Sequence, residues 1–380
     1  MKQKPDRLPK EYFYTAPSVI KKAPIFGMGN RPAWRLGNVI QAKVAKKYSL
    51  NVMLAQQSAR EIERTGRTFK DVLDSAIESA FEAHLTIPWG ADGDHLRNEQ
   101  ELKKAVDAGY THFTYDVSNE LKVSKEEVLD KVVRMYHLTK DLKKDKLFTT
   151  EISLDEASMV TKLDDLTFLL GELQDRKIQI DEIAPHFPGH FEKGIDYYYR
   201  KKDDKITDKF REYLEKVIFV LNQFNCRISI HSGSDKFSLY PIIADVAKGN
   251  FHLKTAGTYY LEDLKIVAGH DRNLFNEIYR FALEQFQKDR ATYELSTDVN
   301  NIPDISKLAS NSEISSLLES GSGLDDLRQI LHVTYGSVLK TKKFADKIFL
   351  ILNQNKKEHY EVLSRHINRH IELLGLKKYY

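Results

Sequence analysis

The chain has 380 residues, of which 41% are hydrophobic and 30% are charged, and its formal net charge is only +3. This composition excludes an intrinsically disordered chain and is typical of a protein with a sizeable core. The charges are spread along the sequence without a basic block, which argues against nucleic acid as a partner. No apolar run approaches the ~20 residues of a membrane-spanning helix, and residues 1–22 lack a signal-peptide core. We therefore expect neither a membrane nor a nucleic-acid partner.

Cys226 is the single cysteine of the chain. One thiol excludes an internal disulfide and a multi-cysteine metal site, and it is typical of a reducing compartment, so we expect a cytoplasmic protein. Because Cys226 lies between an apolar helical segment and a predicted strand, we interpret it as buried and unreactive.

Short β-rich runs alternate with longer segments of helical period from about residue 50 onward, which is the pattern of parallel strands joined by helices. The predicted strands are Asn51–Gln57, His84–Trp89, Thr111–Asp116, Leu147–Ser153, Glu182–Phe187, Arg227–His231, Asn250–Thr255 and Thr292–Thr297. Eight such strands favour an α/β fold of the TIM type, a (β/α)8 barrel. We assign residues 41–308 to this barrel, residues 1–40 to an N-terminal arm with a glycine-rich turn, and residues 309–380 to a C-terminal helical extension.

Two further patterns are interpreted as structural. Gly27 and Gly29 resemble half of a dinucleotide-binding fingerprint, but no βαβ unit precedes them and no third glycine follows at the required place. His366 and His370 have a spacing that can bind a metal on one helix face. The lysines and arginines around them instead predict an exposed basic face.

Polar side chains follow the predicted strands at their C-terminal ends, where TIM barrels form their active sites. Glu151, His231 and His252 lie at the ends of three different strands. One carboxylate and two imidazoles are a common ligand set for a divalent catalytic metal. We therefore predict that these residues bind a divalent ion such as zinc, manganese or nickel. The alternative is a group of hydrogen-bonded rim residues without a metal.

Longer sequence blocks at the same strand ends resemble the tagaturonate epimerase family, which interconverts D-tagaturonate and D-fructuronate. The blocks are QQSARE at 56–61, ERTGRT at 63–68, GADGDH at 90–95, EKGIDY at 192–197, HSGSDKFS at 231–238, FHLKTAGT at 251–258 and HVTYGSVL at 332–339. They follow the order of the family over about residues 25–375. The resemblance implies an isomerase of carbohydrate metabolism whose partner is a small keto-sugar acid or a related ketohexose.

The two sugar acids differ in configuration at C4, two carbons from the C2 ketone, so enolisation beside the ketone cannot exchange that centre. We predict retro-aldol cleavage between C3 and C4, rotation of the aldehyde fragment and re-addition to its other face, with the metal stabilising the enediolate. The C4 hydroxyl must lose a proton on one side and regain it on the other, which requires two acid–base groups. The candidates are Asp94 and Asp196, with His95 and Lys193 as alternatives. Asp196 is alternatively a fourth metal ligand.

Substrate-binding side chains are predicted on the same rim. A substrate carboxylate needs a cation or several hydrogen-bond donors. The candidate cations are Arg60, Lys236 and Lys254, and the candidates for binding hydroxyl groups are Gln57, Ser58 and Thr114. For each of these residues the alternative is a purely structural contact.

Three other functions remain open at this point. Transient oxidation at C4 by a bound nicotinamide would also invert the centre, although the sequence has no convincing dinucleotide fingerprint. A metal-dependent sugar isomerase or aldolase would use the same ligands and release a different product. A non-catalytic carbohydrate-binding protein would bind the sugar without the reaction. Each of these functions is compatible with a homo-oligomer.

Overall fold

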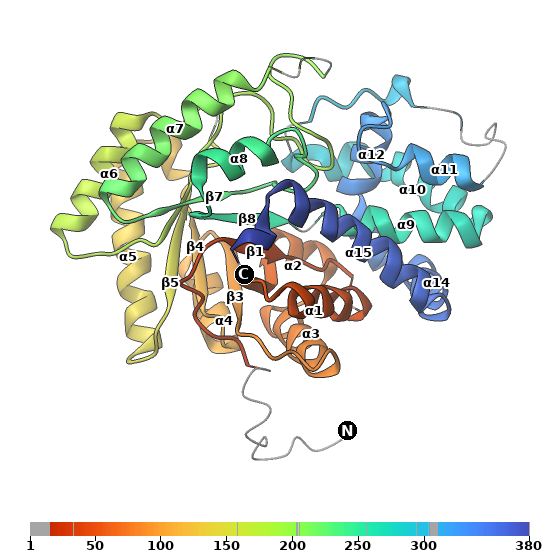
Figure 1. Cartoon of the computed structure of the whole chain (residues 1–380), viewed down its shortest axis with the longest axis horizontal. Coiled ribbons are helices and arrows are strands. Elements are labelled where there is room, and N and C mark those ends of the chain that lie inside the picture. Colours follow the sequence, from red (N-terminus) through yellow and green to blue (C-terminus); the bar gives the residue numbers. More distant parts are fainter. Residues whose placement is uncertain are drawn as a thin grey trace.

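Eight parallel strands close into a barrel in chain order (Figure 1). The structure is a computed structural model that describes residues 16–32, 34–157, 159–202, 204, 206–255, 257–293, 295–302, 304 and 311–379. The strands are β1 (Ile25–Met28), β2 (Val52–Ser58), β3 (Trp89–Leu96), β4 (His112–Asp116), β5 (Thr149–Ser153), β6 (Glu182–Ala184), β7 (Arg227–Ile230) and β8 (Phe251–Thr255). Pairing of β1 with both β2 and β8 closes the barrel. The predicted TIM barrel is confirmed.

Two of the predicted strands are wrong in position. Residues 290–292 form a 3-10 helix instead of starting an eighth strand, and the remaining place in the barrel is taken by β1. Since β1 is only four residues long and contains Gly27, it has no alternating or long apolar run that could mark it as a strand. The strand predicted at 84–89 begins only at Trp89, because His84 follows helix α3 (Phe69–Glu82) with a left-handed φ of 48°.

The predicted boundary at residue 40 also falls inside a regular element. The first strand lies in the segment assigned to the arm, and residue 40 lies within α1 (Leu36–Tyr48), whose inner face is buried against the barrel. The barrel therefore begins at Ile25, well before the predicted boundary. The predicted boundary at 308 lies outside the described residues.

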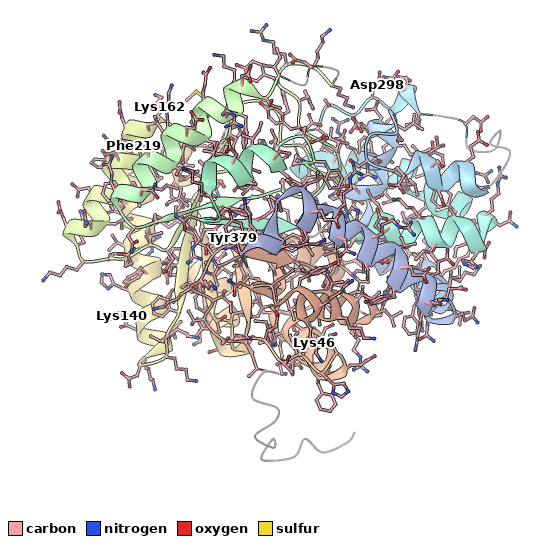
Figure 2. The ribbon with its side chains drawn as sticks, in the orientation of Figure 1. Lys46, Lys140, Lys162, Phe219, Asp298 and Tyr379 are labelled. Atoms are coloured by element: carbon pink, nitrogen blue, oxygen red, sulfur yellow. The ribbon has the colours of Figure 1, made fainter. Side chains whose placement is uncertain are left out.

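Amphipathic helices cover the outside of the barrel. They are α2 (Ala59–Thr65), α3 (Phe69–Glu82), α4 (Glu99–Ala108), α5 (Lys125–Lys143), α6 (Leu163–Asp175), α7 (Asp208–Gln223) and α8 (Tyr240–Ala247). In α3, Thr68 and Asp71 form a reciprocal capping box, and the apolar residues at helical spacing are buried. Charged side chains such as those of Lys46, Lys140 and Lys162 lie at the periphery (Figure 2). This division of apolar and charged faces fixes which side of each helix meets the barrel.

A second group of helices packs at one side of the barrel, on the right in Figure 1. These helices are α9 (Tyr259–His270), α10 (Arg272–Asp289), α11 (Asn311–Leu317), α12 (Asp325–Val333), α13 (Tyr335–Lys340), α14 (Lys342–Gln354) and α15 (Lys356–Leu373). Helices α9 to α14 share an apolar cluster of their own, whereas Leu363, Ile367 and Ile371 of α15 belong to the barrel cluster. Helix α15 therefore packs against the barrel core and connects the C-terminal helices to it.

The interpretation of His366 and His370 as an exposed basic face is wrong. The His370 side chain is fully buried and that of His366 is only 7% exposed, because α15 covers the loop that follows β7. His370 Nδ1 donates to the carbonyl of His366, and His370 Nε2 accepts from the backbone N–H of Asp235. His366 lies between the carboxylates of Asp235 and Glu262.

Cys226 is buried, as the sequence predicts, and its thiol donates a hydrogen bond to the carbonyl of Ile180. Burial raises the pKa of this thiol, which keeps it in the unreactive protonated form. None of the described helices is long and apolar enough to cross a lipid bilayer.

Candidate active site

A pocket of about 720 Å³, counted with its open mouth, lies over the C-terminal ends of the barrel strands. Seven of the residues proposed from the sequence line it: Ser58, Arg60, Asp94, His95, Lys193, His231 and Lys254. Strand pairing explains this convergence, because parallel strands bring the residues after their C-terminal ends to one rim.

Two imidazoles form the centre of the rim. The rings of His95 and His231 lie with their centroids 4.7 Å apart. His95 Nδ1 lies 2.9 Å from Asp94 Oδ1, and His95 Nε2 lies 3.4 Å from Asp155 Oδ1. His231 Nδ1 lies 3.1 Å from the same Asp155 oxygen, and His231 Nε2 pairs with Glu151. Each imidazole therefore lies between two carboxylates, and Asp155 contacts both. We call this group the rim cluster; it consists of Asp94, His95, Glu151, Asp155 and His231.

The rim cluster also carries backbone strain. His95 has a φ of 52°, and Ser232, directly after His231, has a φ of 50°. Residues other than glycine rarely adopt this left-handed conformation, and when they do they concentrate at functional sites.

Charge interactions outweigh burial in setting the ionisation of the rim cluster. Burial disfavours the charged forms, yet Asp94 and Asp155 raise the pKa of His95 well above its usual value. Burial also lowers the pKa of His231, but the charges of Asp155 and Glu151 outweigh this effect and raise it to about 9. Although burial opposes its ionisation, the charges of Lys254 and His95 hold the pKa of Asp94 well below its usual range. Asp94 is thus a carboxylate at neutral pH.

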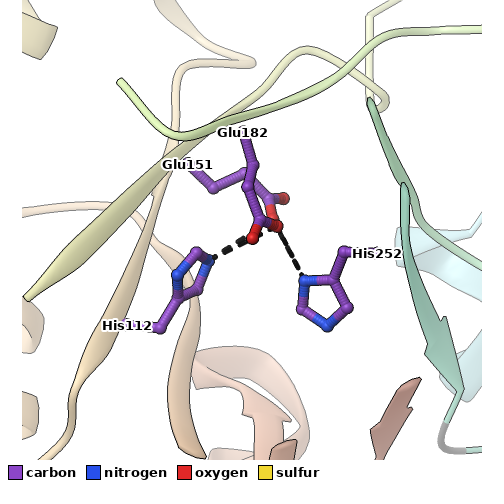
Figure 3. Close-up of side chains that lie close together, drawn as sticks. All are labelled: His112, Glu151, Glu182 and His252. Atoms are coloured by element: carbon purple, nitrogen blue, oxygen red, sulfur yellow. Dashed lines mark hydrogen bonds and ion pairs between the residues drawn. The ribbon is translucent and has the colours of Figure 1, made fainter. Parts of the chain in front are cut away.

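A second polar group fills the barrel one layer below the pocket. It consists of His112, Glu151, Glu182 and His252, whose side chains are all fully buried (Figure 3). His252 Nδ1 lies 2.7 Å from Glu182 Oε2, and His112 Nε2 lies 3.5 Å from Glu151 Oε2. Except for Glu151, which also reaches His231, these side chains do not take part in the rim cluster.

The predicted metal ligands Glu151, His231 and His252 therefore do not share one centre. The pairing of Ser229 with His252 sets His252 two residues below the level of His231, so that Lys254 lies beside His231 instead. His231 and His252 belong to different groups of neighbouring ligand atoms. Only the register between β7 and β8 decides this, and register is not visible in the spacing of the sequence.

Lys254 joins the two layers. Its Nζ lies 2.8 Å from Asp92, 3.0 Å from Asp94 and 3.0 Å from Glu151. It also donates to Thr114 Oγ1, which in turn donates to Asp92. The charge predicted to bind a substrate carboxylate is thus already neutralised by three carboxylates, and Thr114 is engaged within the barrel.

Strand alternation corrects one prediction on β2. Successive side chains of a strand point to opposite faces, so Gln56 and Ser58 share the inner face and Gln57 points outward. Gln56 and Ser58 line the pocket, whereas Gln57 pairs with Arg67 outside the barrel. The alternation was present in the sequence and would have selected Gln56.

Two other predicted residues hold loops together instead of lining the pocket. Asp196 accepts hydrogen bonds from the backbone N–H and the hydroxyl of Ser238. Lys236 is fully buried and donates to the carbonyls of Glu192 and Ile195. Both residues connect the loop after β6 with the loop after β7. Neither is among the side chains that line the pocket.

The structure also places residues in the site that were not predicted. Asp155 and Glu156 follow β5 closely, and their position after a strand end is a signal that could have found them. Glu156 forms a bidentate ion pair with Arg60, with N–O distances of 2.6 and 3.0 Å. Arg31 and His332 line the pocket from segments far apart in the chain, and only the fold brings them together.

Comparison with known proteins places this geometry in a family. The family model described as tagaturonate epimerase matches residues 2–144 and 122–374. The tagaturonate/fructuronate epimerase of Thermotoga maritima is 35% identical over 402 residues, covering 92% of this chain and 80% of that protein. The glycerol-bound crystal structure of fructuronate-tagaturonate epimerase UxaE from Cohnella laeviribosi matches with a TM-score of 0.84 at 30% identity, covering 96% of this chain and 84% of that one. The native crystal structure of that enzyme matches with a TM-score of 0.82 at 30% identity, covering 95% and 83% of the two chains. The chain belongs to the tagaturonate epimerase family.

Proposed function

We infer that this protein is an isomerase that interconverts D-tagaturonate and D-fructuronate by inverting C4. The observation that carries this inference is the rim cluster, which lies at the C-terminal ends of the strands in a chain whose family resemblance spans nearly its whole length. The Asp94 carboxylate, which lines this pocket 3.0 Å from the ammonium of Lys254, supplies the base that the C4 hydroxyl requires. A cytoplasmic location and a homo-oligomeric state stay predictions from the sequence.

The rim cluster fits a divalent metal ion, whose binding would displace the protons that the carboxylates favour on the two imidazoles. His231 Nδ1 faces Asp155 at 3.1 Å but makes no hydrogen bond of suitable direction, and His95 Nε2 faces the same oxygen. Two imidazoles and one carboxylate that converge beside a pocket are a typical catalytic ligand set with an open position. Asp94 and Glu151 contact the opposite nitrogens of the two rings, which is how outer carboxylates orient metal-binding histidines.

We therefore assign the metal to His95, His231 and Asp155 in place of Glu151, His231 and His252. Zinc, manganese and nickel all accept such ligands. When bound there, the ion would act as a Lewis acid on the C2 carbonyl oxygen and stabilise the negative charge that cleavage of the C3–C4 bond leaves on that fragment.

The protein's own residues perform the proton transfer. We assign both proton transfers to Asp94 instead of to two groups: as a carboxylate that lines the pocket it accepts the proton of the C4 hydroxyl when the C3–C4 bond breaks, and it returns that proton to the C4 oxygen when the bond re-forms on the other face. Lys254 at 3.0 Å stabilises the charge of Asp94. Asp196, the other predicted acid–base residue, is turned toward Ser238 and does not reach the pocket. The rotating aldehyde fragment has room in the adjoining cavity, which His186, His190 and Lys193 line together with Asp155.

The activity is tested with tagaturonate that carries deuterium at C4. The metal-loaded protein is expected to form fructuronate that retains the deuterium, because retro-aldol cleavage leaves the C4–H bond intact. Product NMR measures the retention, and the rate with unlabelled substrate gives the isotope effect. Exchange of deuterium with solvent, or release of an aldol fragment as the final product, would contradict the proposal. A large primary deuterium effect at C4 would instead indicate hydride transfer.

The metal assignment is tested by comparing two histidine variants. His95→Gln is expected to lower metal affinity by at least roughly tenfold, because one direct ligand is lost, whereas His252→Gln should keep the metal. Metal content after dialysis, measured by plasma mass spectrometry, distinguishes the two sets. If His95→Gln keeps the metal and His252→Gln loses it, the result would support the ligand set predicted from the sequence, Glu151, His231 and His252.

A further inference from the structure

His332 has no role in the mechanism above, yet its imidazole lines the pocket. It comes from the last turn of α12, far along the chain from the barrel strands. Its side chain is buried, and neither ring nitrogen has a hydrogen-bond partner among the residues that the structure describes. An unsatisfied buried polar group costs free energy, so its presence beside a pocket indicates a ligand that satisfies it.

Two glycines make room for this ring. A Cβ atom on Gly257 would lie 1.9 Å from Cε1 of His332, and a Cβ atom on Gly194 would lie 3.2 Å from its Cγ. Gly257 follows β8 and Gly194 follows β6, so the imidazole reaches the pocket between the loops after two strands. Any larger residue at 257 would displace the ring.

The charges around His332 differ from those elsewhere in the pocket. Most cations that line it are paired: Arg31 with Glu61, Arg60 with Glu156, Arg97 with Glu101, and Lys254 with Asp92, Asp94 and Glu151. Lys193, next to Gly194, has no carboxylate within ion-pair distance in the described part of the chain. Its ammonium is thus available to an anion from solution.

We propose that His332 and Lys193 form the subsite that binds the carboxylate of the sugar acid. The subsite rests on the proposed function, because it serves a substrate that carries a carboxylate. The ammonium supplies the charge and the imidazole supplies an N–H donor, which together form the charge-assisted contacts that carboxylates prefer. The predicted carboxylate-binding residues cannot do this, since Arg60 and Lys254 are paired and Lys236 is buried against backbone carbonyls.

The ionisation of His332 is consistent with this subsite. Burial and the charges of Arg31 and Lys193 hold the pKa of His332 well below its usual value, so the free protein carries a neutral ring there. An incoming carboxylate offsets the charge of Lys193, because Arg31 is already paired with Glu61. The C-terminal helices thereby contribute a side chain that distinguishes a sugar acid from a neutral sugar.

The test compares tagaturonate with the neutral ketohexose D-tagatose in the metal-loaded enzyme. Lys193→Met and His332→Asn are each expected to lower kcat/KM for tagaturonate by roughly 10- to 100-fold, mainly through KM, the range of a lost charge-assisted hydrogen bond. The value for D-tagatose should change by less than about threefold. Gly257→Ala should reproduce the effect by displacing the ring. Lys216→Met, which removes one charge from the exposed face of α7, is the matched control and should change neither value.

If the Lys193 and His332 variants lose kcat/KM equally for tagaturonate and for D-tagatose, the proposed subsite is wrong. If His332→Asn fails to fold, Lys193→Met and Gly257→Ala decide the result. If the wild-type protein epimerises neither sugar acid, the proposed function fails and calorimetry then tests the subsite by itself. Weaker binding of tagaturonate to Lys193→Met than to Lys216→Met would support the subsite, and equal binding would overturn it.

Discussion

Replacement of Asp94 by asparagine is expected to lower kcat by roughly two to four orders of magnitude, the usual contribution of a general acid–base group. Asparagine preserves the size of the side chain and keeps an oxygen for the contacts with His95 and Lys254. It cannot accept the proton of the C4 hydroxyl. The loss should therefore appear in kcat at saturating metal, measured by following the conversion of tagaturonate by NMR.

The matched comparison for Asp94 is Asp196→Asn. Both residues were acid–base candidates from the sequence, but only Asp94 lines the pocket. Asp196→Asn should retain kcat within about tenfold, well short of the loss of a general base. Metal content must be measured in both variants, because Asp94 also contacts the proposed ligand His95. Full activity of Asp94→Asn with the metal bound would contradict the mechanism, and a large loss confined to Asp196→Asn would transfer the role to that residue.

Replacement of Arg328 by methionine is expected to lower the free energy of unfolding by about 3–5 kcal/mol, the usual cost of leaving a buried charge without its partner. Arg328 and Asp235 form an ion pair in which both side chains are fully buried. Arg328 also donates to the carbonyls of Gly194 and Leu318, so it joins the loop after β6, the loop after β7 and the C-terminal helices. Denaturation by urea, followed by circular dichroism, measures the change.

Two comparisons isolate the buried pair. Arg211 forms an ion pair with Asp245 in which the two side chains are 38% and 65% exposed. Arg211→Met should therefore lower the free energy of unfolding far less than Arg328→Met does. The double variant Arg328→Met/Asp235→Asn should recover part of the loss, because the buried charge is removed together with its partner. A destabilisation of Arg328→Met no larger than that of Arg211→Met would contradict the assignment.

The pH range of the measurement matters for Asp235. Burial raises its pKa, but His366 and Arg328 outweigh burial and hold the pKa well below the usual value. A depressed pKa in the folded state contributes stability that is present above the unfolded value of about 4 and is lost as the pH falls below it. The comparison of variants at pH 7 therefore includes the full contribution of this carboxylate.

Local patterns in the sequence determined the class of the fold and the location of the chemistry. Alternating strand and helix periods predicted the barrel, and polar residues after strands predicted a site at the C-terminal rim that includes Asp94, His95 and His231. These features are local because the period of each element and the residues that follow it lie close together in the chain. The long blocks shared with the tagaturonate epimerase family predicted the activity.

Tertiary structure alone decided which of these residues meet. The register between β7 and β8 placed Lys254, not His252, beside His231, and closure of the barrel recruited the short strand β1 from a segment without a strand pattern. Packing of α15 buried His366 and His370, and packing of α12 brought His332 between Gly194 and Gly257. Register and helix docking depend on contacts between residues that are distant in the chain, such as Ser229 with His252 and Gly194 with His332, and the short windows that reveal helix or strand periodicity do not contain both partners of such a contact.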